Sequence, residues 1–329
     1  MEKLLIYRER LLKFVAAKGK YVQAVTRFIG GVLLFFTVGQ IYGYTEILDQ
    51  SFFLIVMGLI CVFVPTSAVS LMFHGVIVLQ LAHVSIEIML CYLLLILFYN
   101  LTYQRNFPKT RLYLMMTPVF FYFHIPAFLP LFIGSFVGIM GLPSILMGAI
   151  CYYIASIVQY AVIEIDAGTV SEEVYSLVIE RIFDSTELLL CLVVFSLVTA
   201  IVSVIRKKGN GHGWNIAIIT GGVVYLVMMF IGGYFTYSEV SILSETFMIF
   251  LSVFVALVLQ FFHIVVDYTR EETFEFEDEE YYYYVKAVPK VSVEEEDINI
   301  TNITKPSRRF SLKRKDRDDI RDKEEGEKT

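Results

Sequence analysis

The stretch LLLCLVVFSLVTAIVSVI, residues 188–205, carries no charged side chain over 18 positions and is followed directly by Arg206, Lys207 and Lys208. As an α-helix it would be about 27 Å long, close to the hydrocarbon thickness of a bilayer. The stretch therefore predicts a transmembrane helix that ends at a basic flank.

Nine other apolar runs lie along the chain. A full crossing takes about 20 residues. The first run and the last four approach this length, whereas the runs between residues 52 and 140 are shorter or interrupted, mostly at proline. The ten runs are Phe28–Tyr44, Phe52–Val64, Ser67–His83, Val84–Leu101, Leu112–Ile125, Ala127–Met140, Pro143–Ile163, Leu188–Ile205, Trp214–Tyr234 and Thr246–Val266.

The composition also points to a membrane protein. Of the 329 residues, 57% are hydrophobic and 18% charged, and residues 270–329 alone hold 31 of the 60 charged side chains. The rest of the chain has too few charges to solvate a globular surface, which excludes a soluble enzyme, a secreted disulfide domain and a nucleic-acid-binding protein. We expect an all-α, polytopic transmembrane helix bundle of about eight to ten spans, with a short extended or disordered C-terminal tail.

The charge distribution predicts three parts. These are a basic amphipathic segment (1–27), a transmembrane domain (28–267) with an acidic external loop (164–187), and a charged, mostly disordered cytoplasmic tail (268–329). The first part has seven basic residues against two acidic ones. Its apolar residues fall near helical spacing, which fits a helix lying on an anionic membrane surface; a plain basic flank is the alternative.

Basic loops predict the orientation, because Lys and Arg in short loops stay on the cytoplasmic side. The N-terminal segment, loop 102–111, loop 206–213 and the tail are rich in these residues, whereas loop 164–187 has a single Arg181 among seven acidic groups. We therefore expect a plasma-membrane protein with both termini in the cytoplasm.

This orientation requires an odd number of crossings between residues 51 and 103, and again between 111 and 163. Three short helices in each stretch would give ten crossings in total. Two long helices in each would give eight but would place Arg105, Lys109 and Arg111 outside. One crossing plus a re-entrant hairpin in each would give six.

Five prolines lie within or beside apolar runs and are candidate positions of helix breaks. Proline removes a backbone donor and clashes with the preceding turn, so the freed carbonyl groups need partners in protein or cavity water. Broken helices therefore favour a cavity-lining role. The alternative is that these residues only shape helix packing. They are Pro65, Pro118, Pro126, Pro130 and Pro143.

Polar residues inside apolar runs are candidates for a transport pathway or proton relay. Gln80, His83 and Glu87 follow i, i+3, i+7 spacing, which predicts one helical face, and His124 lies among the clustered prolines. His83 and Glu87 could instead form a structural hydrogen-bonded pair or hold a metal with two ligands.

Catalytic signatures are absent. The sequence contains no GxSxG, HExxH or Walker A string, and its four cysteines lie in apolar runs without CxxC spacing. We expect no enzyme activity, no cofactor, no metal site and no disulfide.

The stretch FEFEDEEYYYYVKAVPK, residues 274–290, lies in the tail. Alternation over Thr273–Glu277 and Tyr284–Val293 predicts a strand or an extended peptide, which can add to the sheet edge of a cytosolic partner through residues 270–297. The stretch resembles the tail of uncharacterised multi-pass membrane proteins from Gram-positive anaerobes. The resemblance implies a bacterial plasma membrane and brings no activity with it.

Two functions fit these features. The first is a permease-like protein, either alone or as the membrane part of a larger transporter, that moves an unknown solute or ion through a pathway at broken helices. The second is a non-transporting anchor or sensor whose tail recruits a cytosolic partner. The lipid bilayer is the expected partner in both, and nucleic acid in neither.

Overall fold

The computed structural model describes residues 2–44, 50–166, 174–208, 213–236, 242–263, 272–277 and 282–287. The chain divides into two compact units, Met1–Val266 and Asp267–Thr329. The described part of the first unit is helical, and the second contains a two-stranded sheet. The predicted all-α membrane bundle with an extended tail is confirmed.

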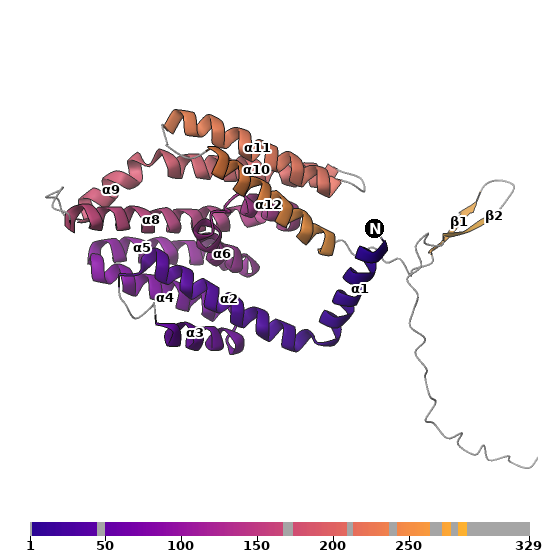
Figure 1. Ribbon diagram of the computed structural model, residues 1–329, viewed down its shortest axis with the longest axis horizontal. Coiled ribbons are helices and arrows are strands. Elements are labelled where there is room, and N and C mark those ends of the chain that lie inside the picture. The colour runs from indigo at the N-terminus through magenta and orange to yellow at the C-terminus, as the bar shows by residue number, and fades with distance from the viewer. Residues whose placement is uncertain are drawn as a thin grey trace, which may run out of the picture. The chain divides into compact units, whose positions relative to one another are not determined.

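The described residues of the first unit form twelve α-helices and four short π- and 3-10-helical turns (Figure 1). The α-helices are α1 (Glu2–Ala17), α2 (Gly19–Tyr42), α3 (Ser51–Phe63), α4 (Thr66–Val84), α5 (Ile86–Tyr99), α6 (Arg111–Tyr122), α7 (Phe128–Phe132), α8 (Leu142–Asp166), α9 (Val174–Asp184), α10 (Thr186–Lys208), α11 (Gly213–Thr236) and α12 (Ile242–His263). Two π-helical turns, η2 (Asn100–Gln104) and η4 (Ile133–Val137), extend α5 and α7, and two 3-10 turns, η3 (Pro108–Thr110) and η5 (Ile139–Gly141), precede α6 and α8.

Seven segments of the described residues are long and apolar enough to cross a membrane. Many of their large hydrophobic side chains point outward, as lipid-facing helices require. The uncharged stretch at 188–205 lies within α10. The seven segments are Gly19–Tyr42, Thr66–Val84, Ile86–Gln104, Ile139–Ile163, Thr186–Lys207, Gly213–Tyr234 and Leu243–Phe262.

Helix α3 has only 13 residues, yet it also runs back along the bundle. The Arg27 guanidinium near the start of α2 donates to the Val62 carbonyl oxygen at the end of α3, at 3.5 Å. Gly58 of α3 packs against Phe28 and Val32 of α2. The two helices are therefore antiparallel, and α4 starts at the end of the bundle where α2 started.

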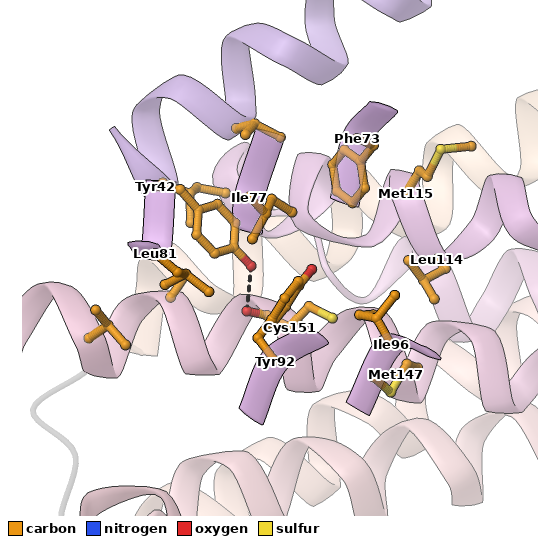
Figure 2. Close-up of a cluster of buried hydrophobic side chains, with 14 of the residues drawn as sticks. Tyr42, Phe73, Ile77, Leu81, Tyr92, Ile96, Leu114, Met115, Met147 and Cys151 are labelled. Carbon is orange, nitrogen blue, oxygen red and sulfur yellow. Dashed lines mark hydrogen bonds between the residues drawn. The ribbon is translucent and has the colours of Figure 1, made fainter. Parts of the chain in front are cut away.

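Two apolar clusters form the core. The first joins α2, α4, α5 and α8 and includes Tyr42, Tyr92 and Cys151 (Figure 2). The second joins α7, α10, α11 and α12. Helix α8 contributes to both, because Ile145 and Ala149 belong to the second cluster. In Figure 1, α8 lies between the two groups of helices.

Residues 111–137 form a hairpin that does not cross the bundle. Helix α6 runs parallel to α8, since Thr117 lies against Gly148 and the Phe121 ring stacks on Tyr152 with centroids 4.5 Å apart. Continuing this alignment of α6 with α8 places His124, at the tip of the hairpin, level with the middle of α8, which ends at Asp166.

The second arm returns to the end where the hairpin began. The Ser203 hydroxyl near the end of α10 donates to the Gly134 carbonyl oxygen in η4, at 3.2 Å. The Tyr103 hydroxyl, just before the hairpin, donates to the Met140 carbonyl oxygen, just after it. Residues 111–137 are therefore re-entrant.

The observed passes combine two of the predicted arrangements. Three helices, α3, α4 and α5, cover residues 51–104, and one crossing plus a hairpin covers 111–163. With α3 the described helices make eight passes, since α2, α8 and the C-terminal helices α10, α11 and α12 complete the set. The expectation of three crossings between 111 and 163 is wrong, because the tip of the hairpin reaches only the middle of α8 and the second arm returns to the end where the hairpin began.

The five prolines act differently. Pro65 separates α3 from α4, and Pro126 separates α6 from α7. Pro130 and Pro143 lie in the first turns of α7 and α8, where a missing amide hydrogen costs little. Of the five, only Pro118 interrupts the hydrogen bonds inside a helix, α6.

His124 closes α6 in a left-handed conformation, with φ of 58°. Its amide donates to the Phe121 carbonyl oxygen at 3.0 Å, and the Ile125 amide donates to the Phe120 carbonyl oxygen at 2.9 Å. This pair of hydrogen bonds is the Schellman motif, in which glycine usually occupies the left-handed position.

His124→Gly is expected to leave the free energy of unfolding unchanged or raise it by up to about 1 kcal/mol, because glycine adopts this conformation without strain. His124→Val should lower it by about 1–2 kcal/mol. Unfolding in detergent, followed by the thiol reactivity of buried cysteines, measures both. Equal stability of the two variants would contradict a left-handed residue here.

The tail unit holds the antiparallel strands β1 (Glu272–Glu277) and β2 (Tyr282–Ala287). Glu272 pairs with Ala287 and Glu277 with Tyr282. The strand predicted over 273–277 is confirmed, and that over 284–293 is observed as far as Ala287. Residues 288–329 of the tail, which was predicted to be mostly disordered over 268–329, lie outside the described residues, as do 167–173 of the acidic loop.

Candidate functional site

The predicted face of Gln80, His83 and Glu87 does not exist. Helix α4 ends at Val84, and Ser85 is extended, with φ of −158° and ψ of 134°. Glu87 therefore lies on α5, and the prediction of one helical face is wrong.

Ser85 causes the break because it caps the next helix. Its side-chain oxygen accepts from the Ile88 amide at 3.4 Å, and its hydroxyl donates to Glu87 at 2.6 Å. Both His83 and Glu87 are exposed. A carboxylate in the first turn of a helix is stabilised by the helix dipole. Capping at the start of α5 therefore accounts for the presence of Glu87 in this apolar region.

Gln80 and His124 do not take part in the hydrogen bonds around Ser85 between α4 and α5. Gln80 is buried and accepts from the Tyr44 amide at 3.2 Å, which ties the end of α4 to the end of α2. The Tyr44 hydroxyl has no partner within the described residues, and burial raises the pKa of Tyr44. His124 is exposed at the hairpin tip. No described hydrogen bond or ring contact joins His124 to Gln80, His83 or Glu87.

A set of buried polar side chains outside the predicted site lies within the first apolar cluster. His74 of α4 forms a hydrogen bond through Nδ1 to the Tyr92 hydroxyl of α5, at 3.0 Å. The Tyr42 hydroxyl of α2 donates to the Cys151 carbonyl oxygen of α8, at 2.7 Å (Figure 2). These bonds join α4 to α5 and α2 to α8, so they stabilise the packing of the first apolar cluster.

Tyr92→Phe is expected to lower the free energy of unfolding by about 1–3 kcal/mol, because it leaves the buried His74 ring without its partner. Tyr160→Phe removes the same atom from an exposed ring and should change stability by less than about 0.5 kcal/mol. Chemical unfolding in detergent compares the two. Equal effects would show that the His74 hydrogen bond contributes nothing.

The second set of buried polar side chains lies on η2, η4 and α10. Both π-helical turns carry a fully buried polar side chain without a hydrogen-bond partner, Gln104 in η2 and Ser135 in η4. Thr199 of α10, which packs on η4, is a third. π-Helical turns are frequent at functional sites.

Several other Ser and Thr hydroxyls in the described helices donate to the backbone of their own helix. Six examples donate to the carbonyl oxygen four residues earlier at 2.7–2.8 Å: Thr26, Thr37, Thr102, Thr117, Ser196 and Ser252. Ser135 and Thr199 make no such bond. A buried hydroxyl without a partner costs about 1–3 kcal/mol unless water or a ligand satisfies it.

These three side chains come from elements that meet at η5. Tyr103 of η2 bonds to Met140 of η5, and η4 and α10 both contact η5. The three side chains therefore supply neutral amide and hydroxyl groups on elements that pack around η5. Within the described ranges, no group of three or more His, Cys, Asp or Glu side chains could hold a metal ion.

Fold and site together define a polytopic helical membrane protein. No protein-family model matches its sequence, and no curated protein or solved structure is detectably similar to it.

Little in the sequence indicates this site. Gln104, Ser135 and Thr199 are neutral residues within or beside apolar runs, whereas His83 and Glu87 stand out there as ionisable groups. The clustered prolines did point to the hairpin that carries Ser135.

Proposed function

We propose that this protein is permease-like and moves a small polar solute or ion past the re-entrant hairpin. The observation that carries the proposal is that three fully buried side chains, Gln104 of η2, Ser135 of η4 and Thr199 of α10, have no hydrogen-bond partner. A set of neutral donors and acceptors suits a polar solute or a weakly held ion better than a tightly bound metal.

The hairpin supports this proposal because it ends within the bundle. Backbone turns at membrane depth are tolerated where they are buried in protein or line a hydrated cavity. Interrupted helices near the middle of the bilayer are typical of binding sites in transporters. The tip at Phe123–Ala127 is such an interruption.

Charge supports a cytoplasmic location for the hairpin ends. Arg105 and Lys109 precede α6, Arg111 begins it, and Arg206 to Lys208 end α10 close to η4. Basic residues in short connections stay on the cytoplasmic side. We infer a plasma-membrane protein with both termini in the cytoplasm and the hairpin entered from that side.

Reconstituted vesicles test the function. The probes are K⁺, Na⁺ and H⁺, followed with potential- and pH-sensitive dyes, and glycerol, followed by light scattering. At least one flux should exceed that of protein-free vesicles, and Ser135→Ala or Thr199→Val should reduce it about tenfold, the equivalent of one hydrogen bond.

Ser252→Ala is the matched control, because Ser252 already donates to the Met248 carbonyl oxygen. It should leave the flux unchanged. Absence of any flux above the protein-free level, with folded protein in the vesicles, would overturn the permease proposal.

The tail favours a second candidate function, a membrane anchor that recruits a cytosolic protein. Strands β1 and β2 form a two-stranded sheet within a unit of their own. Such a hairpin is marginal alone, and a partner strand can pair with either edge. Under this alternative, chemical cross-linking should join the full-length protein to a cytosolic protein. A chain that ends at Thr269 should form no such adduct, although its membrane unit stays folded. An adduct that persists without the tail would contradict it.

A further inference from the structure

We propose that α1 lies on anionic lipid headgroups and inserts one apolar stripe into the membrane surface. The stripe consists of Tyr7, Leu11 and Phe14, at i, i+4 and i+7, which share one helical face. Their exposed fractions are 68%, 51% and 54%. Three large apolar side chains on one face of a short terminal helix would be costly in water.

The stripe is bordered by basic residues. Arg10, Lys13, Lys18 and Lys20 are exposed, and the Lys18 ammonium lies 5.3 Å from the centre of the Phe14 ring. Long basic side chains can cover apolar surface with their stems while their charges reach lipid phosphates. An apolar face bordered by cations matches anionic lipid, which offers both hydrocarbon and negative charge.

A side of α1 next to the stripe is held by protein. Arg8 is only 7% exposed, and its guanidinium lies 5.5 Å from the centre of the Phe261 ring near the end of α12. This contact fixes which face of α1 turns away from the bundle. The stripe of Tyr7, Leu11 and Phe14 is therefore oriented outward by a tertiary contact.

The direction of α1 fits a surface helix. The chain bends at Lys18, with φ of −111° and ψ of 25°, and Figure 1 shows α1 turned steeply away from the axis of α2. Beyond the bend the exposed apolar surface continues along α2 at Tyr21, Val25 and Ile29. Because α2 spans the bilayer, the stripe on α1 is continuous with a surface that already faces lipid.

A tryptophan reporter tests this assignment in the full-length protein. Phe14→Trp is combined with Trp214→Phe, which removes the single native tryptophan. The protein is reconstituted in phosphatidylcholine vesicles with or without phosphatidylglycerol. With phosphatidylglycerol, Trp emission should shift to shorter wavelength, acrylamide quenching should fall, and lipids brominated near the headgroup should quench strongly.

Replacing Arg10, Lys13, Lys18 and Lys20 with Gln should abolish the difference between the two vesicle types. A reporter at Phe183 of α9, which is 84% exposed, should show no dependence on phosphatidylglycerol. The unreactive thiol of buried Cys151 verifies that each variant is folded.

Two results would overturn the proposal. Equal acrylamide quenching in both vesicles without quenching by brominated lipid would place α1 in water. Equal quenching by brominated lipid in both vesicles would refute the selection of anionic headgroups.

Discussion

Gly148→Leu is expected to lower the free energy of unfolding by about 3 kcal/mol and to push the hairpin out of place. A Cβ atom at position 148 would lie 2.5 Å from Cβ of Thr117 and 2.8 Å from the Leu114 carbonyl oxygen. The second of these is backbone, so α6 as a whole must move to accept a side chain.

The close approach has a local cause. Pro118 has no amide hydrogen to donate to the Leu114 carbonyl oxygen one turn earlier. Gly148 lies against this carbonyl group, where a Cα–H contact can partly replace the missing bond. The substitution thus removes both a tight helix contact and the cover over a freed carbonyl group.

Gly75→Leu in α4 is the matched control, because no atom lies within 4 Å of its added Cβ. It should leave stability within about 0.5 kcal/mol of the parent chain. Unfolding in mixed detergent micelles compares the two variants. A Gly148→Leu protein as stable as Gly75→Leu would refute the packing described for the hairpin.

Gly31→Leu is expected to separate α3 from α2 and to expose Cys61. The added Cβ would lie 2.8 Å from both Cβ and Sγ of Cys61 and 3.3 Å from Cα of Gly58. Two glycines facing each other let these backbones approach closely, as small residues do between membrane helices. We expect a loss of about 2–3 kcal/mol.

The readout is alkylation of Cys61, which is buried in the parent protein. Its reaction with a small maleimide in micelles should accelerate at least tenfold in Gly31→Leu. The neighbouring Gly30→Leu is the control, because nothing lies within 4 Å of its Cβ. Equal Cys61 reactivity in the two variants would show that α3 does not depend on the Gly31 contact.

The long spans could be predicted because their apolar runs match the thickness of a bilayer. The run 188–205 needed no tertiary information, and α10 contains it. The helix break at Ser85 could also be predicted from the sequence, because serine before an acidic first turn is a common helix start. The i, i+3, i+7 spacing of Gln80, His83 and Glu87 runs across this break, which is why the predicted face is wrong.

The sequence indicated where a re-entrant hairpin would lie, but it did not favour a hairpin over short helices that cross the membrane. A re-entrant arm and a short crossing bury similar apolar residues, so hydrophobicity alone does not separate them. The tip of the hairpin could not be predicted, because the left-handed position that ends α6 is occupied by His124 and not by the usual glycine. Ser135 and Thr199 could not be found from spacing, because what sets them apart is the absence of a bond that similar residues make.

The re-entrant hairpin is the central feature of this structure, and one labelling measurement tests it directly. In a chain whose four native cysteines are replaced, three separate variants each carry one new thiol: His124→Cys at the hairpin tip, Asn106→Cys before α6, and Phe183→Cys in α9. All three positions are exposed. Asn106 lies at the end of the bundle where the hairpin begins, and Phe183 lies beyond the far end of α8.

A membrane-impermeant maleimide is applied to each side of sealed vesicles that contain one of the three variants. The structure predicts that the thiols at positions 106 and 183 react from opposite sides, and that the thiol at position 124 never reacts from the side that labels position 183. Reaction at position 124 from that side, as fast as at position 183, would mean two full crossings and would contradict the hairpin.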